Sequence, residues 1–593
     1  MKAILGNWNP SQSPEPISIW AKLRGRFGQT WNFEALSRNP EPGTQNPELA
    51  SSQLAWQGQV TVQKSVPNIR FFIGASGLVS KADVVGEITA RELRLERDSF
   101  GRVPLFWTAH NGSIWFSTEL SLLIEITGRS IVDPQGLYGY ICFSYVPTPL
   151  TPIDGIAAVP AGETLCWQAM TGTPESVEKT ILRRSLRTHE WREDQVTVDD
   201  EDLAVSALRR LLTEATESLV TDVAGNQVGV FLSGGLDSSI VAALLVRAGV
   251  KVKAYSLDFG GYGLPELEFA EAVASHLRIP LVKVPAQPKH IRRALQSTVQ
   301  ALELPFGDGV TVPLYLLGQA AGKEVNIVFN GEGGDQLFAG WTNKPLIAAS
   351  VYQPSVTENS KLTDEYLRTF HRLYGYESSV FTPHLQAVSD QMVPVGWIQP
   401  ALDGGYCQSF FHRMRRAGLM LKGAQNIQPR ATRLAWAHGL DVRSPFCFYP
   451  LAEWTFQLSG ELCLRGPCEK YLLKRAVEPW LPGEIVWREK RGMGVPLTEW
   501  CLGPLWGELG RWLNASTLDA EDRWQSDLPL RVAFGQLSGH IQGRRIGEIL
   551  WLLLVWQVWR KTVAGETICP QSLRSPFRMP FPLLRFLERT LVE

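Results

Sequence analysis

The spacing of hydrophobic residues changes character about a third of the way along the chain. Up to about residue 170, apolar and polar positions alternate in short runs, for example over 71–75, 93–97 and 113–117. Alternation with a period of two, bounded by turn residues, is typical of half-buried β-strands. We therefore predict an amino-terminal domain built largely from short strands.

From about residue 203 the apolar residues recur at helical spacing, beginning with 203–220. Strand-like segments follow and alternate with helical segments. The strands are expected at 228–232, which is a buried-strand run, and at 252–257 and 325–329, and the helices at 239–246, 266–277 and 312–321. This alternation predicts a parallel α/β sheet, which binds ligands at the carboxyl ends of its strands. After about residue 341 the pattern is mostly helical.

A pair of helices is expected near the end of the chain, one around Arg545 and one over 551–560. The spacing of its large apolar residues is that of core packing; they are Trp551, Leu552, Val555, Trp556 and Trp559. The apolar stretch 549–558 is shorter than the ~20 residues that span a bilayer.

A polar, charged stretch separates the two patterns. We therefore predict a domain over 1–171, a linker over 172–202 and a second domain over 203–593. A chain of 593 residues is too long for one core, which agrees with this division.

Composition narrows the choice of partner and compartment. The 58 basic and 59 acidic residues leave no net field that would attract nucleic acid or an anionic membrane. The eight cysteines form no CxxC pair, so the sequence indicates neither a zinc ribbon nor a dithiol redox site. With no signal peptide at the start, these features predict a reduced, cytoplasmic protein.

The strand expected at 228–232 leads directly into Ser233-Gly234-Gly235-Leu236-Asp237-Ser238-Ser239, which opens a helix. Two glycines let consecutive backbone amides face one concavity, and a helix amino terminus adds positive potential, so this loop is suited to phosphate. Ser233, Ser238 and Ser239 supply hydroxyl donors. Asp237 would be repelled by phosphate without a cation between them, which implies Mg²⁺. No lysine follows the glycines, so the loop is not that of γ-phosphate transfer.

Several motifs resemble the asparagine synthetase superfamily, whose members cleave ATP between the α- and β-phosphates. The loop over 233–239 resembles the family's pyrophosphate loop. Four further segments are similar to family motifs and occur in the same order: Leu302–Asp308 (E-x-P-F-x-D), Asn330–Trp341 (S-G-[ED]-G-[SG]-D-E-L-F-G-G-Y), His438–Phe446 (L-E-V-R-x-P-F) and Arg488–Leu497 (R-x-K-x-G-F-x-x-P).

The resemblance implies roles for individual residues. Glu332 corresponds to the carboxylate that the family needs for adenylate formation and amine attack, and Lys490 to a lysine that approaches the phosphates. Asp335 would share Mg²⁺ with Asp237 at the carboxyl edge of the sheet. Phosphate and adenine contacts would fall on Leu232, Ser233, Gly234, Gly235, Asp237, Ser238, Leu257, Asn330 and Gly331, while Arg443 would brace the site. The alternatives to these catalytic roles are that Glu332 only caps the following helix and that Lys490 is an ordinary surface lysine.

The amino-terminal segment is similar to a glutaminase domain of the amino-terminal-nucleophile type, with a layered α+β fold. Met1–Gly6 resembles M-C-G-I-x-G, and Arg97–Leu105 resembles R-D-x-x-G-x-x-P-L. The nucleophile of that family must follow Met1, where this chain has Lys2. The N-G-E-[IL]-Y-N segment that holds glutamine is absent near 60–80, and Cys142 lies far along the chain. We expect the fold to be kept and glutamine hydrolysis to be lost.

The function expected from these motifs is an ATP- and Mg²⁺-dependent ligase that activates a carboxylate, by default L-aspartate, and amidates it with ammonia or an amine. Two alternatives stay open: a cyclase of the lasso-peptide or β-lactam type, whose amine belongs to the substrate, and a non-catalytic regulator. A precursor peptide and a homodimer also stay open as partners. Phe448 stands where the family has an aspartate, which leaves the carboxylate unidentified.

Overall fold

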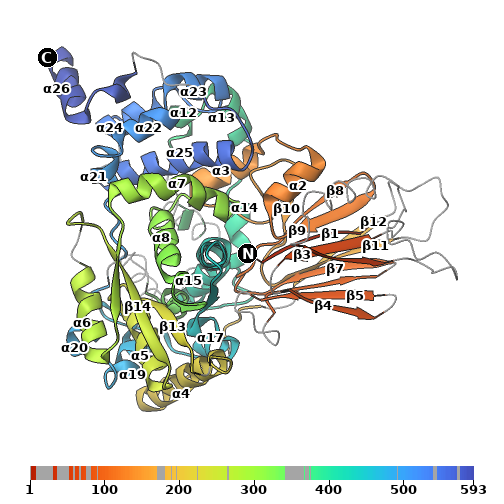
Figure 1. Ribbon diagram of the computed structural model, residues 1–593, viewed down its shortest axis with the longest axis vertical. Helices are drawn as coiled ribbons and strands as arrows, with labels where there is room; N and C mark the ends of the chain where they lie inside the picture. The colour runs from red at the N-terminus through yellow and green to blue at the C-terminus, as the bar shows by residue number, and fades with distance from the viewer. Residues whose placement is uncertain are drawn as a thin grey trace.

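The computed structural model has two parts that share an interface (Figure 1). It describes residues 2–8, 31–36, 52–57, 60–65, 68–74, 82–89, 91–169, 181–187, 190–194, 197–223, 225–263, 266–340, 363, 366–367, 373, 375–490, 492–537, 544–569 and 575–592. Met1, position 75 of the first predicted strand, Trp341 and Arg491 lie outside these ranges, as do residues 172–180, 188, 189, 195 and 196 of the predicted linker.

The amino-terminal part contains two antiparallel sheets, on the right in Figure 1. One has the strand order β10-β8-β9-β1-β3-β2 and the other β12-β11-β7-β6-β5-β4. The strands are β1 (Ala3–Trp8), β2 (Asn32–Leu36), β3 (Ser52–Gln57), β4 (Val60–Ser65), β5 (Asn68–Ile73), β6 (Val84–Ile88), β7 (Glu92–Arg97), β8 (Phe106–His110), β9 (Ser113–Ser117), β10 (Ala157–Ala158), β11 (Glu163–Ala169) and β12 (Ile181–Arg187). Helices α2 (Leu120–Thr127) and α3 (Pro134–Phe143) follow β9. The layered α+β fold expected from the sequence is confirmed.

Strand β12 lies inside the range predicted as a linker. It pairs with β11 over seven residues, from Ile181 opposite Ala169 to Arg187 opposite Glu163. Its position at a sheet edge explains why it is polar and reads as a connecting segment. The chain then crosses to the carboxy-terminal part, where the Glu193 amide donates to the Tyr406 carbonyl.

The carboxy-terminal part contains the expected parallel sheet, with the order β15-β14-β13-β16-β17. Its strands are β13 (Gln227–Phe231), β14 (Lys251–Asp258), β15 (Leu281–Pro285), β16 (Ile327–Phe329) and β17 (Asp441–Arg443), and the helices around it include α4 (Glu201–Leu219), α5 (Leu236–Arg247), α6 (Leu267–Leu277), α7 (Pro288–Leu302) and α8 (Thr311–Ala321). Strands β15 and β17 and helix α7 were not expected from the sequence. The carboxyl ends of β13, β14 and β16 meet at one edge and position the site described below.

Helices dominate the rest of the described chain, as predicted. They are α9 (Gly334–Leu337), α12 (Glu377–Val380), α13 (Pro383–Ser389), α14 (Val395–Ile398), α15 (Phe410–Gly418), the π-helix Leu419–Ile427, α16 (Gln428–Trp436), α17 (Tyr449–Thr455), α18 (Gly460–Cys463), α19 (Tyr471–Val477), α20 (Gly483–Val486), α21 (Leu497–Cys501), α22 (Trp506–Trp512), α23 (Ala515–Glu521), α24 (Leu528–Phe534), α25 (Arg544–Thr562) and α26 (Phe581–Val592), with a short hairpin of β18 (Leu464–Arg465) and β19 (Cys468–Glu469).

Helix α25 replaces the helical pair expected near the end of the chain. It runs without a break from Arg544 to Thr562, because no proline separates the two predicted segments. The glycine between them, Gly547, stays helical, and its missing side chain lets the helix approach Thr498. All five of its predicted core residues are buried, which confirms their packing role. No helix in the described residues is both long and apolar enough to cross a membrane.

A large hydrophobic cluster contains residues from both parts of the chain. It includes Trp115 from the amino-terminal sheets and Trp556 from α25. At the boundary, the Tyr140 ring lies 5.5 Å from the Trp556 ring, and the Tyr140 hydroxyl donates to the Leu552 carbonyl at 2.8 Å. The two parts are therefore packed against each other through apolar side chains.

Candidate active site

The serine–glycine loop after β13 has the shape that its sequence predicts. Gly234 adopts a φ of +74°, and a side chain there would come within 2.6 Å of the Ala270 amide. The Ser233 and Ser238 hydroxyls lie 3.1 Å apart, and the Gly235 amide donates to the Ser233 hydroxyl at 3.3 Å. These contacts hold two hydroxyls and the start of α5 around one concavity.

Ser239 departs from the expectation. Its hydroxyl donates to the Gly235 carbonyl at 2.8 Å, and the residue is fully buried. It therefore stabilises the first turn of α5 and does not line the pocket.

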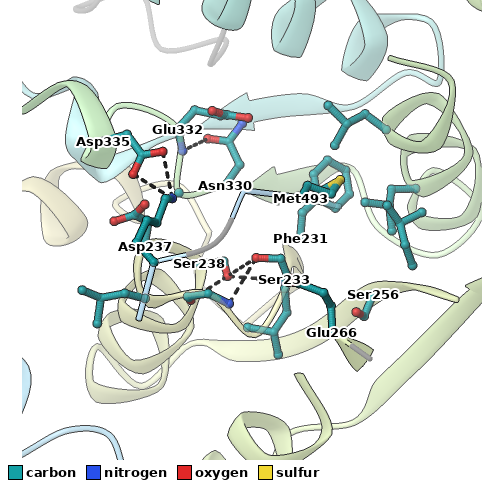
Figure 2. A pocket seen from close by; sticks show the side chains of 18 of the residues that line it. Phe231, Ser233, Asp237, Ser238, Ser256, Glu266, Asn330, Glu332, Asp335 and Met493 are labelled. Atoms are coloured by element: carbon teal, nitrogen blue, oxygen red, sulfur yellow. Dashed lines mark hydrogen bonds and ion pairs between the residues drawn. The ribbon is translucent and has the colours of Figure 1, made fainter. Parts of the chain in front are cut away.

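The glycine-rich loop after β16 packs directly on the first loop. A side chain at Gly331 would lie 2.7 Å from the Ser238 amide, and one at Gly334 would lie 2.5 Å from Asp237 Oδ1. Only glycine allows so close an approach. The contact brings Asp335, in the first turn of α9, to the same end of the pocket as Asp237, as Figure 2 shows.

Glu332 lies beside these aspartates with its backbone fixed from both sides. Its amide donates to Asn330 Oδ1 at 3.3 Å, and its carbonyl accepts from the Ser444 hydroxyl at 2.6 Å. The N-cap of α9 is Gly333, so Glu332 is not a helix cap. Burial raises the pKa of the Glu332 carboxyl against the opposing charge of Arg430. A carboxylate with a raised pKa is suited to accepting a proton near neutral pH.

Lys490 is part of the same cluster and not a surface lysine. Its ammonium donates to Asp335 at 2.9 Å, and its side chain is only 22% exposed. Burial acts to lower the pKa of Lys490, but Asp335 and Asp237 outweigh it and raise the pKa above its ordinary value. Burial acts to raise the pKa of Asp335, but a second lysine, Lys470, and Lys490 outweigh it and hold this pKa well below its usual range.

One pocket is lined by all the predicted site residues except Gly234, which packs against Phe269 and Ala270. Asp237, Asp335 and Glu332 lie at one end with Ser233 and Ser238 beside them, and apolar side chains gather on the other side, where Ser256 and Glu266 also lie (Figure 2). Two of the predicted adenine contacts, Leu232 and Leu257, belong to the apolar wall. The wall is formed by Leu232, Leu257, Phe231, Phe259, Leu314, Leu317, Leu434 and Met493. The shape suits a nucleotide, with a base at one end and phosphates at the other.

Arg443, expected to brace the site, acts on the sheet. Its guanidinium is buried and pairs with Asp222 at 2.6 Å, beyond the end of α4. Its carbonyl accepts from the Asn330 amide at 3.0 Å, so β17 fixes the start of the second loop through its backbone.

The structure adds residues that the sequence did not single out. Lys470 lies between Asp237 and Asp335. Arg430 pairs with Asp308 at 2.9 Å, and Asn426 in the π-helix donates to the same carboxylate at 2.8 Å. The E-x-P-F-x-D resemblance marked Asp308 without giving it a partner. No sequence pattern identifies Lys470 or Arg430, because the aspartates with which they pair lie more than 100 residues away in the sequence.

Position 2, where the resembling glutaminases have their nucleophile, makes a contact between the two parts. The Lys2 ammonium lies 2.7 Å from Asp441 Oδ1 in β17 and 5.6 Å from the centre of the Trp436 ring. Figure 1 shows the start of the chain at this junction. Cys142 is buried in α3, and burial raises the pKa of its thiol well above the ordinary value. A buried thiol of raised pKa is a poor nucleophile.

Comparison with known proteins agrees with this geometry. The family model described as asparagine synthase matches residues 207–561, and that described as a glutamine amidotransferase domain matches 84–177. A Mycobacterium tuberculosis protein whose name assigns it provisionally as a glutamine-hydrolysing asparagine synthetase is 26% identical, over 82% of this chain and 76% of that protein. Asparagine synthetase (glutamine-hydrolysing) 1 of Bacillus subtilis is 22% identical, over 80% of this chain and 76% of that protein.

Among solved structures, an NH3-dependent NAD synthetase from Campylobacter jejuni matches with a TM-score of 0.18 and 15% identity, over 34% of this chain and 97% of that one. A similarity this low supports no conclusion. The family match instead spans more than half of the chain and includes the glycine-containing loops after β13 and β16, Glu332 and Lys490. On that match and on the pocket that its motifs form together, this chain belongs to the asparagine synthase family.

Proposed function

We propose that this chain is an ATP-dependent ligase that activates a carboxylate as an acyl-adenylate and converts it into an amide. Family membership supports an amide-forming ligase and the use of ATP. The observation that carries the finer proposal is that the serine–glycine loop, two aspartates, Glu332 and Lys490 line one pocket with an apolar far end. L-aspartate is the default substrate.

In the first proposed step, a carboxylate oxygen of the substrate attacks the α-phosphorus of ATP. The bond from this phosphorus to the bridging oxygen breaks, and pyrophosphate leaves. The loop at 233–238 offers backbone amides and hydroxyls to the departing phosphates. Lys490, whose raised pKa keeps it charged, stabilises the negative charge that develops there.

In the second proposed step, a nitrogen attacks the acyl carbon and the bond to the AMP oxygen breaks. The attacking nitrogen must lose a proton, and Glu332 is the proposed acceptor. Its raised pKa supports this role, since a base works best when its pKa approaches the working pH. AMP and the amide are the products.

Mg²⁺ is proposed to bind between Asp237 and Asp335 together with the phosphates. No group of three metal-ligating side chains occurs among the described residues. Mg²⁺ is commonly held by one or two carboxylates plus substrate phosphates, so the two aspartates fit an ion that arrives with the nucleotide. The ion would neutralise phosphate charge in the first step.

We further propose that the amino-terminal part no longer hydrolyses glutamine. Residue 2 is a lysine whose ammonium is held by Asp441 and by the Gly74 carbonyl at 3.2 Å. Neither this group nor the buried Cys142 can act as the thiolate nucleophile that the resembling glutaminases use. The nitrogen would then be free ammonia or an amine, including one carried by the substrate itself.

The test is ATP–pyrophosphate exchange by the purified chain against a panel of carboxylic acids, followed by AMP release with ammonium, glutamine or an amine. We expect exchange with one class of carboxylate and product formation with ammonium or an amine. If no carboxylate supports exchange, the alternative that this chain is a non-catalytic regulator would be favoured. Turnover with glutamine alone would contradict the loss of glutaminase activity.

A further inference from the structure

Lys470 lies at the position from which one cation contacts both predicted metal ligands. Its ammonium is 2.6 Å and 2.5 Å from the two carboxylate oxygens of Asp237 and 2.5 Å from Asp335 Oδ1. Its side chain is only 1% exposed, while those of Asp237 and Asp335 are 14% and 36% exposed. The lysine therefore joins the two loops from the closed side of the pocket.

The chain is shaped to hold this lysine there. Lys470 has a φ of +56°, a left-handed conformation that residues other than glycine seldom adopt. A side chain at Gly340 would come within 2.0 Å of Lys470 Cε and 2.3 Å of Asp335 Oδ1. An unusual backbone conformation and a glycine that makes room for the side chain both fix the ammonium between the aspartates.

A divalent cation that bridged the same carboxylates would need the same space. Mg²⁺ binds oxygen at about 2.0–2.1 Å, so it cannot occupy the space between these two carboxylates while the ammonium is in contact with both. Lys470 and Lys490 also balance the charges of Asp237 and Asp335, which removes the net negative charge that would attract a cation. Nucleotide phosphates change both conditions, because they supply oxygen ligands for the cation and new acceptors for the ammonium.

We propose that Lys470 occupies the cation position in the nucleotide-free protein and makes binding of a divalent cation at Asp237 and Asp335 depend on bound nucleotide. The inference rests on the proposed function, since it assigns both aspartates to the metal. Lys470 acts here as a positioning residue, and the order of binding is cation with nucleotide or after it.

The experiment measures Mn²⁺ binding to the full chain by the electron paramagnetic resonance signal of free Mn²⁺. Without nucleotide, we expect at least tenfold tighter binding by Lys470→Met than by the wild type, and wild-type behaviour for Lys470→Arg. With α,β-methylene-ATP, the wild type should bind Mn²⁺ at least tenfold more tightly than without it. The proposal would be overturned if, without nucleotide, the wild type bound Mn²⁺ as tightly as Lys470→Met does.

Lys490→Met is the matched control, because it removes one positive charge from the same cluster without emptying the position between the aspartates. An equal gain in Mn²⁺ affinity for Lys490→Met would refute the proposal in favour of a general effect of charge. Thermal unfolding gives a second measurement: MgCl2 alone should raise the melting temperature of Lys470→Met but not that of the wild type.

Lys470→Gln serves if the methionine variant does not fold, since its amide can still donate to the aspartates. The same gain in affinity is expected of it, and an unchanged affinity would count against the proposal. These measurements need no carboxylate, so they fail independently of the proposed reaction. If the expected Mn²⁺ affinities are found but no pyrophosphate exchange occurs, the role of Lys470 is supported and the proposed ligase activity is refuted. If exchange occurs without these affinities, the ligase activity is supported and the role of Lys470 is refuted.

Discussion

The ion pair between Lys2 and Asp441 connects the two parts of the chain, and removing it should lower the free energy of unfolding. Lys2→Met removes the charge and keeps an unbranched side chain of similar length. The two groups are 2.7 Å apart, and their side chains are 9% and 17% exposed. At an effective dielectric constant of about 20, two unit charges at this distance attract each other by about 6 kcal/mol before desolvation is subtracted.

The measured loss should be smaller than this attraction, because forming the pair removes both groups from water. Deleting one partner of a buried pair typically costs 3–5 kcal/mol, since the other charge stays buried and unpaired. Asp441 keeps some contact with water, so we expect Lys2→Met to lower the free energy of unfolding by about 3 kcal/mol. This figure includes the lost cation–π contact with Trp436, worth about 0.5–1 kcal/mol.

A double-mutant cycle with Asp441→Asn isolates the pair. We expect the double variant to be about 2 kcal/mol more stable than the sum of the single losses predicts, because neither charge is then left alone. Urea unfolding followed by tryptophan fluorescence supplies the four free energies. Arg210→Met is the control, since its pair with Glu214 is 62% and 44% exposed and should contribute less than about 1 kcal/mol. Additive losses in the cycle would refute the reasoning.

Three further predictions concern single carboxylates. Asp237→Asn should lower ATP–pyrophosphate exchange by about 100-fold or more with an unchanged circular dichroism spectrum, and full activity would exclude it as a metal ligand. The raised pKa of Glu332 should set the acidic limb of the amide-forming rate above pH 4.5, and that limb should vanish in Glu332→Gln; an identical limb in the variant would exclude it as the base. Burial raises the pKa of Glu303 from 4.5 to about 7, with Arg433 opposing the shift and Glu119 adding to it. Between these two pH values the folded chain therefore binds more protons than the unfolded chain. The free energy of unfolding should fall by about 3 kcal/mol as the pH rises through this window. Urea unfolding at pH 5 and pH 8 should show a flatter dependence in Glu303→Gln, and an unchanged slope would assign the effect to other groups.

The parallel sheet could be predicted where its strands are buried on both faces. Strand β13 is apolar from Val228 to Phe231 and β14 is buried from Ala254 to Leu257, and each lies next to two others in the sheet. Strand β15 is at the edge and partly exposed, and β17 has only three residues, two of them charged. Both depend on pairing with a neighbour and not on their own composition, so their local sequence does not reveal them.

The candidate site divides in the same way. The loops after β13 and β16 were predictable, because glycines and serines that follow a buried strand have local physical requirements. Lys470 was not, because nothing around it marks the αL turn before α19 as part of a site. Its relation to Asp237 exists only once residues 233 positions apart in the sequence are brought together by the fold.

The resemblance of the amino-terminal part to a glutaminase has a physical cause that does not require glutaminase chemistry. Arg97, the first residue of its R-D-x-x-G-x-x-P-L motif, is buried and donates to the Val103, Val159 and Gly101 carbonyls. It also donates across the boundary to the Ala424 carbonyl in the π-helix, and a side chain at Gly101 would lie 2.4 Å from that oxygen. The same π-helix carries Asn426, which orients Asp308 near the pocket. Substituting Gly101 would therefore disturb the π-helix that positions Asp308, so this segment has a packing role that does not depend on a nucleophile at position 2.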